Sequence, residues 1–184
     1  MVEVAHRLFR RQGYERTGFS EVLQESGAAR GAIYHHFPGG KEELALAVIE
    51  RSNREITERV FDTTASATRP SVALRRYVED TITNLEASGY EAGCPLAPLV
   101  LEAASWSPVL RDATRDAFDD WSSAIVDLLR ARGVPLGRAR RLAAVLIAAI
   151  EGAMLLARTY ERPDALRAVV AELGPVLDAA AEAP

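Results

Sequence analysis

Apolar side chains recur at intervals of three and four residues through almost the whole chain, and this spacing constrains the fold more than any other feature. Leu142, Val145, Leu146 and Ala149 set the pattern in one stretch, and comparable stripes occur elsewhere. That period places apolar side chains on one face of an α-helix, whereas a half-buried strand alternates with a period of two. No alternating segment stands out. The sequence therefore predicts an all-α protein.

Glycine and proline residues divide the helical pattern into nine segments. Helices are predicted from the start of the chain to about residue 13, over 19–26 and 30–36, from 41 to about 62, and over 71–88, 95–106, 108–132, 137–160 and 163–181. Three short helices precede a long one and a larger helical group. This order predicts two functional parts, an N-terminal helix-turn-helix domain at residues 1–45 and a larger helical domain at residues 46–184.

Charge is unevenly distributed along the chain. The whole sequence has 22 Lys and Arg residues against 26 Asp and Glu residues, a net charge of -4. It is therefore no polycation that would coat nucleic acid by charge alone. The first 41 residues instead hold six bases against four acids, a net +2, together with all three histidines. This asymmetry indicates an anionic partner for the N-terminal part.

Several protein classes are disfavoured by composition. Cys94 is the only cysteine, which excludes an intrachain disulfide and a cysteine metal cluster and favours a reducing cytoplasm. The charged first residues lack the apolar core of a secretory signal. The most apolar run, from Leu142 to Ala157, contains Glu151 and is short for a bilayer span of about 20 residues. We therefore expect a cytoplasmic protein with no membrane partner, and no catalytic, metal or cofactor site.

Two short predicted helices near the start are separated by a glycine-containing turn. Segments 19–26 and 30–36 are joined by Gly27-Ala28-Ala29, a spacing typical of helix-turn-helix units. In such a unit the second helix lies in the DNA major groove. With Ile33 and Phe37 facing inward, the other residues of the second helix are expected to be exposed: Arg30, Gly31, Ala32, Tyr34, His35 and His36.

Each of these exposed residue types has a use on DNA. Arg30 can bind a phosphate or a guanine edge, and the Ala32 methyl group can meet a thymine methyl group. Gly31 allows close approach of the helix. The Tyr34 hydroxyl and the two histidine rings can donate to phosphate oxygens. Lys41, the only lysine in the chain, begins the next helix, where free backbone N–H groups and the helix dipole already favour a phosphate.

The order and spacing of these motifs resemble a known family. The matching residues are Gly13-Tyr14, Thr17, the helix around Val22, Gly27, the run GAIYHHF and Lys41-Glu42-Glu43-Leu44. Over about residues 5–48 they are similar to the DNA-binding segment of the TetR (tetracycline repressor) family. The remaining chain resembles the family in helical architecture. The resemblance implies a homodimeric repressor that binds a palindromic DNA operator and is released by a small molecule.

The resemblance also extends the expected DNA contacts to the start of the predicted helix over 19–26, at Thr17, Gly18 and Ser20. Gly18 departs from the family pattern, because a serine or threonine that caps the helix and touches phosphate is common there. Glycine also caps helices but offers no side-chain oxygen.

The two C-terminal apolar stripes are wider than one small domain needs. Small residues such as Ala149 and Ala153 permit close helix contact, so we predict a four-helix seam between two copies of the chain. The predicted seam residues are Leu142, Leu146, Ala149, Ala153, Leu156, Leu166, Val170, Leu173 and Leu177. The alternative is that these stripes form the core of a single chain.

A ligand pocket is predicted among the middle helices, because aromatic and methionine side chains line apolar pockets. The candidates are Tyr77, Leu85, Leu99, Trp106, Phe118, Trp121, Glu151 and Met154, for most of which plain core packing is the alternative. Glu151 is a carboxylate within an apolar stretch and needs a partner, which could be a ligand, Arg158 or a second subunit.

Two other functions compete with that of a repressor. A helical small-molecule carrier or enzyme with a vestigial helix-turn-helix would bind or turn over a ligand and show only nonspecific affinity for duplex DNA. A DNA-binding activator would share every feature above, and the residues do not separate it from a repressor.

Overall fold

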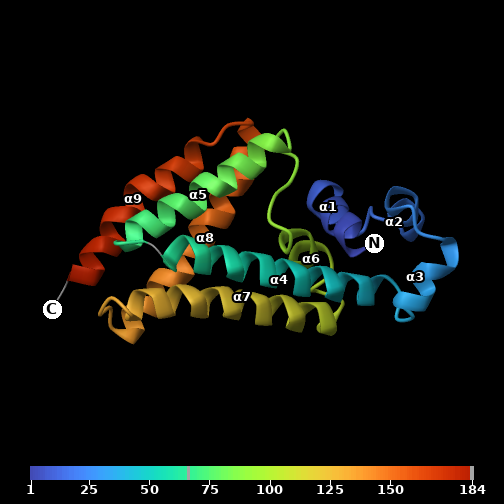
Figure 1. Ribbon diagram of the computed structural model, residues 1–184, viewed down its shortest axis with the longest axis horizontal. Helices are drawn as coiled ribbons and strands as arrows, with labels where there is room; N and C mark the ends of the chain where they lie inside the picture. Colours follow the sequence, from blue (N-terminus) through green and yellow to red (C-terminus); the bar gives the residue numbers. More distant parts are fainter. Residues whose placement is uncertain (66, 183–184) are drawn as a thin grey trace. The chain divides into compact units, whose positions relative to one another are not determined.

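The part of the chain that the structure describes is built from α-helices (Figure 1). This computed structural model describes residues 1–65 and 67–182, and the side chains of all of these except Arg30 and Ala65. The helices are α1 (Val2–Gln12), α2 (Phe19–Ser26), α3 (Arg30–His36), α4 (Lys41–Ala65), α5 (Pro70–Ala87), α6 (Ala97–Glu102), α7 (Pro108–Arg130), α8 (Leu136–Tyr160) and α9 (Asp164–Glu182). The all-α prediction is confirmed, and each predicted helix has a counterpart.

The largest difference from the predicted bounds is at α6. The pattern predicted a helix over 95–106, whereas α6 ends at Glu102. Beyond it the backbone forms turns, and Trp106 N–H donates to the carbonyl of Ala103 at 3.1 Å. The next residue, Ser107, precedes Pro108, and a residue before proline is disfavoured in the helical conformation. The Trp106 ring nitrogen donates to the Glu102 carbonyl at 2.7 Å and so satisfies one of the last α6 carbonyls.

The helices form two compact units, which differ from the predicted domains. One unit contains residues 1–54 and 92–118, and the other contains 55–91 and the chain from 119 onward. Helix α4 therefore contributes to both units, whereas the sequence placed the boundary near residue 45. Residues 92–118 join the N-terminal helices partly through Arg10, whose Nε donates to the carbonyl of Gly93 at 2.8 Å.

The first unit buries one face of each of its short helices. Its core side chains include Val4, Leu8, Phe9, Val22, Ile33, Leu44 and Val48. Helices of seven to eleven residues are marginal in isolation, so this shared burial is what stabilises them. Gly13 ends α1 with φ 94° and ψ 167°, a conformation that essentially only glycine adopts.

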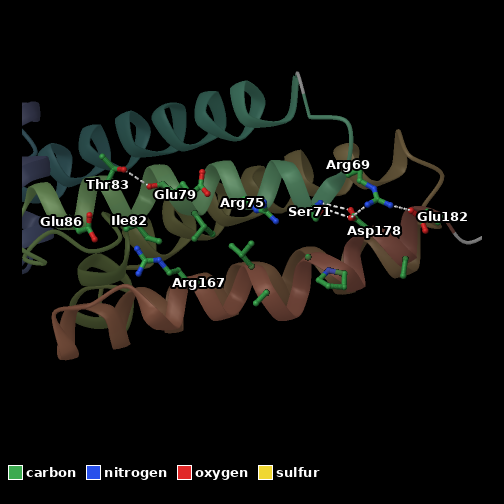
Figure 2. Close-up of a pocket in the computed structure, with 16 residues that line it drawn as sticks. Arg69, Ser71, Arg75, Glu79, Ile82, Thr83, Glu86, Arg167, Asp178 and Glu182 are labelled. Atoms are coloured by element: carbon green, nitrogen blue, oxygen red, sulfur yellow. Dashed lines mark hydrogen bonds and ion pairs between the residues drawn. The ribbon is translucent and has the colours of Figure 1, made fainter.

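The second unit is centred on α5, α8, α9 and the C-terminal half of α7. Helix α9 packs along α5 and α8 (Figure 1). Asp178 on α9 fixes the start of α5, since its carboxylate accepts from the Ser71 N–H at 3.0 Å and from the Ser71 hydroxyl at 2.7 Å (Figure 2). Arg69 adds an ion pair to Glu182 at 2.6 Å. This cap from a different helix replaces the local serine cap that a helix start commonly uses.

An open groove lies along α5 and α9, with a volume of about 1110 Å³ (Figure 2). Apolar side chains that line it include Val78, Ile82 and Val170. Its rim carries charges of both signs, among them Arg75, Glu79, Glu86 and Arg167. The rim charges therefore favour neither an anionic nor a cationic ligand.

Helix α8 is apolar on two opposite faces. Its inner face is buried in the chain's own core and consists of Ala139, Ala143, Leu146, Ile150, Ala153 and Ala157. Its outer face is exposed and includes Val145, Ala148, Gly152, Leu155 and Leu156. By length and composition alone, α8 is the one helix in the described part of the chain that could cross a membrane. Length and composition do not distinguish a membrane-spanning helix from a bundle helix with two apolar faces.

Candidate nucleic-acid interface and ligand cavity

Helices α2 and α3 form the predicted helix-turn-helix. Gly27 ends α2 with φ 67°, the left-handed conformation that suits glycine at this position. Ile33 is fully buried beneath α3, whereas Tyr34 is 66% exposed and both His35 and His36 face solvent. The apolar side of α3 is thus committed to the core, and its polar side is left accessible.

Most of the predicted DNA-contacting residues lie at exposed positions of these two helices. Gly18 is the N-cap of α2 and is exposed, as are Ser20 and Gly31, while Ala32 is half-buried. The ring of Tyr34 packs edge-on against Phe19 of α2, with 5.9 Å between the ring centres. The backbone of Arg30 begins α3, but its side chain lies outside the described part of the structure.

Thr17 does not fit the role that the resemblance implied for it. Its side chain is 1% exposed, and its hydroxyl donates to the Gly13 carbonyl at 2.8 Å. The backbone N–H of Thr17 is also used, because it donates to the Tyr14 carbonyl at 3.2 Å. Thr17 therefore shapes the loop between α1 and α2 and has no group free to reach a phosphate.

Lys41 is at the first turn of α4, as predicted, but it is held more closely than a solvent-exposed lysine. Its Nζ donates to the Glu15 carbonyl at 3.1 Å and lies 4.3 Å from the centre of the Tyr14 ring. Partial burial lowers the pKa of Lys41, and the charges of Glu15 and Glu102 oppose that shift. Since an ammonium group has three donors, two of them remain for an anion.

Residues 92–107 play a part in this unit that the sequence patterns did not predict. Glu102 at the end of α6 accepts a hydrogen bond from the backbone N–H of Glu15 at 2.7 Å. Ser107 donates to the carboxylate of Glu42, next to Lys41. Trp106 lies against Tyr14, with 6.2 Å between the ring centres. A glutamate at the end of the apolar run APLVLE was the one available signal.

A small cavity lies within the second unit, with a volume of about 80 Å³. Three of the predicted ligand residues line it: Tyr77, Trp121 and Glu151. The wall is otherwise mostly apolar and comes from α4, α5, α7, α8 and α9: Ile56, Val60, Thr63, Thr64, Pro70, Ala73, Leu74, Ile125, Leu128, Leu129, Leu146, Ile147, Ile150 and Leu177. The α4 residues were not predicted, because the candidates were chosen mainly for aromatic and methionine side chains.

The other five predicted ligand residues do not line this cavity. Leu85 is buried in the core of the second unit, and Met154 packs against that core. Leu99 is buried in the first unit and Trp106 is 55% exposed there. Phe118 is half-buried at the end of the first unit's portion of α7. These residues shared aromatic or apolar character with the true lining, but composition did not reveal which helix faces meet.

Most residues of the predicted dimer seam lie on the inner faces of α8 and α9, in or against the core of the same chain. Four of its residues, Leu146, Ala153, Leu166 and Leu177, are buried in the core of the same chain. Leu142, Val170 and Leu173 pack against that core, and Ala149 is half-buried. Leu156 is 47% exposed and is the one predicted seam residue on the outer face. For the buried stripe, the alternative of an intrachain core was the correct interpretation.

Comparison with known proteins gives the class to which this architecture belongs. Residues 1–48 match the family of bacterial regulatory proteins of the tetR type. Residues 70–172 match the C-terminal domain of LmrA/YxaF-like transcriptional regulators. The chain therefore belongs to the TetR family of helix-turn-helix transcriptional regulators. The family consists of DNA-binding regulators rather than enzymes, which removes the enzyme alternative.

Individual relatives place the chain more closely. It is 33% identical to the HTH-type transcriptional regulator LmrA of Bacillus subtilis, over 86% of this chain and 85% of that one. A TetR transcriptional regulator from Chloroflexus aurantiacus has a crystal structure with a TM-score of 0.76 at 30% identity, over 96% of this chain and 91% of that one. A Legionella pneumophila TetR regulator reaches a TM-score of 0.85 at 20% identity, over 95% and 94% of the two chains, and supports the fold alone.

Proposed function

We propose that this regulator is a homodimeric repressor that binds a near-palindromic operator and is released by a small apolar ligand. The observation that carries the proposal is that α3 has one buried face and one exposed face. Ile33 anchors the helix in the core, while Gly31, Tyr34, His35 and His36 are exposed. A helix so placed in a helix-turn-helix unit enters the major groove. Because operator DNA is the target, we expect the protein to act in the cytoplasm.

The contacts divide into those that position the protein and those that read sequence. Tyr34, Lys41 and the free N–H groups at the start of α2 offer donors to phosphate oxygens. We expect Arg30 and Ala32 to read base edges, because an arginine can bind a guanine edge and an alanine methyl group can meet a thymine methyl group. Exchanging Lys41 for alanine should weaken binding to all duplexes alike, whereas exchanging Ala32 should change sequence preference.

Binding can be tested on a duplex that the protein itself selects. A duplex of about 30 base pairs, roughly three DNA turns, would be selected from a random-sequence library by the wild-type protein. Its dissociation constant would be measured over a range of salt concentrations and compared with that of an unselected duplex. Each phosphate contact contributes about -0.9 to the slope of log affinity against log salt. Equal affinity for both duplexes would contradict the proposal.

The outer face of α8 and α9 supports the dimer. Its members are Val145, Ala148, Gly152, Leu155 and Leu156 on α8, and Ala168, Ala171, Pro175, Val176 and Ala179 on α9, and all are exposed in the single chain. Apolar residues spaced three and four apart on two adjacent helices are suited to a four-helix seam. Binding two half-sites of one operator requires two α3 helices about one DNA turn, ~34–36 Å, apart, and a dimer supplies two such helices.

The dimer is tested by one charge on that face. Leu155 is 65% exposed, so Leu155→Glu should leave the fold intact and convert the dimer to a monomer when mass is measured by light scattering. Phe61→Glu is the matched control, because Phe61 is 69% exposed but lies on α4. A Leu155→Glu variant with the mass of the wild type would place the seam elsewhere.

The small cavity of the second unit supports the proposal that a ligand releases the protein from DNA. At about 80 Å³ it is smaller than the ~150 Å³ that an apolar cavity needs to hold a ligand the size of benzene. A larger apolar ligand must therefore favour a form in which the cavity is wider, and a ligand shifts an equilibrium only through such differential affinity.

The test is to screen aromatic and aliphatic compounds of about 6–20 heavy atoms for a rise in melting temperature and loss of operator binding. In vitro transcription from a promoter that carries the operator separates repressor from activator.

A further inference from the structure

Glu102 lies at the end of α6, far in sequence from the helix-turn-helix, yet its carboxylate contacts the loop that leads into α2. One oxygen accepts from the Glu15 N–H at 2.7 Å. The other fills the space beside Gly13, where a Cβ atom would come within 2.4 Å of it. Glu102 and this loop belong to the same compact unit. The loop between α1 and α2 is therefore shaped around this carboxylate.

The same loop holds Lys41. Glu15 contacts both residues through its backbone. Its N–H donates to Glu102, and its carbonyl accepts from Lys41 Nζ at 3.1 Å. The neighbouring Tyr14 ring lies beneath the ammonium group at 4.3 Å. Burial, aided by the charges of Glu15 and Glu42, raises the pKa of Tyr14 to about 12. The ring is therefore neutral, and it attracts the cation through its π face.

Trp106 completes the arrangement. Its ring nitrogen donates to the Glu102 carbonyl at 2.7 Å, and its ring lies 6.2 Å from that of Tyr14. Ser107, the next residue, both caps α7 through the Leu110 N–H at 3.1 Å and donates to the carboxylate of Glu42 on α4. The turn after α6 therefore contacts two neighbours of Lys41, namely Tyr14 through Trp106 and Glu42 through Ser107.

We propose that Glu102 is a positioning residue for DNA binding, which holds the loop at Gly13 to Glu15 so that Lys41 presents its ammonium group to a DNA phosphate. This inference rests on the proposed function, since it assumes that Lys41 contacts phosphate. It adds that the contact is set by a side chain outside the helix-turn-helix. The essential property of Glu102 is the reach of its acceptor oxygen to the Glu15 N–H.

Two substitutions separate reach from charge. Glu102→Gln keeps an acceptor at the same distance but removes the charge, whereas Glu102→Asp keeps the charge but withdraws the carboxylate by one methylene group. We expect Glu102→Gln to bind the selected duplex within about twofold of wild type. We expect Glu102→Asp to bind about tenfold more weakly, as for loss of one hydrogen bond to a charged group, with a salt slope reduced by about 0.9. Glu50→Gln, at an exposed acid of α4 in the same unit, is the control for loss of a negative charge.

A double substitution tests whether Glu102 acts through Lys41. Residues that act through one contact show non-additive effects, so Lys41→Ala with Glu102→Asp should bind no more weakly than Lys41→Ala alone. Additive losses would overturn the inference, as would wild-type affinity for Glu102→Asp or a tenfold loss for Glu102→Gln. Thermal unfolding of each variant shows whether a loss reflects unfolding. If Lys41→Ala itself leaves the salt slope unchanged, the phosphate contact in the proposed function fails. A failure confined to Glu102→Asp leaves that contact standing.

Discussion

His6 makes the stability of the first unit dependent on pH in a direction that can be worked out from its surroundings. The side chain is 7% exposed, and its Nε2 is buried without a hydrogen-bond partner among the described residues. Burial, followed by the positive charges of Arg10 and Arg51, lowers the pKa of His6 from 6.5 to about 4, and the charge of Glu3 opposes this shift. The folded protein therefore keeps His6 neutral where an unfolded chain would protonate it.

The magnitude follows from proton linkage. Between pH 6.5 and about 4 the unfolded state binds a proton that the folded state does not, so the free energy of unfolding falls as pH falls. At about 1.4 kcal/mol for each pH unit, His6 removes about 3 kcal/mol by pH 4. Above pH 6.5 both states hold a neutral imidazole and the effect vanishes. A loss of this size is a large fraction of the stability of a typical domain.

The assay compares wild type with His6→Leu, which has no titrating group. Urea unfolding followed by circular dichroism at several values between pH 7 and 4 should show the difference between the two proteins changing by about 3 kcal/mol. His35→Gln, which removes an exposed imidazole, serves as the matched control. NMR titration of the His6 ring gives its pKa directly. A folded-state pKa at or above 6.5, or the same pH slope in His6→Leu, would refute the reasoning.

Three further predictions concern single positions. Gly13→Ala should lower the free energy of unfolding by about 2 kcal/mol, because φ 94° is unsuited to alanine and the new Cβ would meet Glu102; a urea midpoint equal to wild type would contradict this. Gly31→Ala places a Cβ in open space within α3, so it should raise stability by up to about 1 kcal/mol while weakening operator binding; unchanged affinity would show that the helix does not approach DNA closely there. Asp178→Ala should cost about 1–2 kcal/mol by removing the cap of α5, and Asp178→Asn should recover part of this loss in the same unfolding measurement.

The helices were predictable because apolar spacing and glycine or proline breaks are local properties. Segments 19–26 and 30–36 were predicted with the bounds that the structure has. The side of α3 that faces inward was also predictable, since Ile33 is one of its few apolar residues. The same reasoning failed on α8, where both faces are apolar. Leu146 and Val145 look alike in sequence, and only the core that α8 shares with α5, α7 and α9 decides which is inside.

Side-chain contacts between distant segments could not be predicted from the sequence for a related reason. Thr17 matched the family pattern of a DNA contact, but its burial depends on the loop that Glu102 shapes. The cavity lining depends on how the C-terminal half of α4 meets α5, α7 and α8. These are properties of tertiary packing, which no local pattern of residue types records.

The position of Lys41 has a practical consequence for chemical labelling. It is the only lysine in the chain, so amine-directed reagents and formaldehyde have one side-chain amine with which to react, apart from the chain terminus. That amine lies over Tyr14 in the proposed DNA contact. Reductive methylation would therefore act as a single-site footprint, in which bound duplex shields the one reactive side chain. Crosslinking of this regulator to chromosomal DNA through lysine would likewise depend on one nitrogen atom.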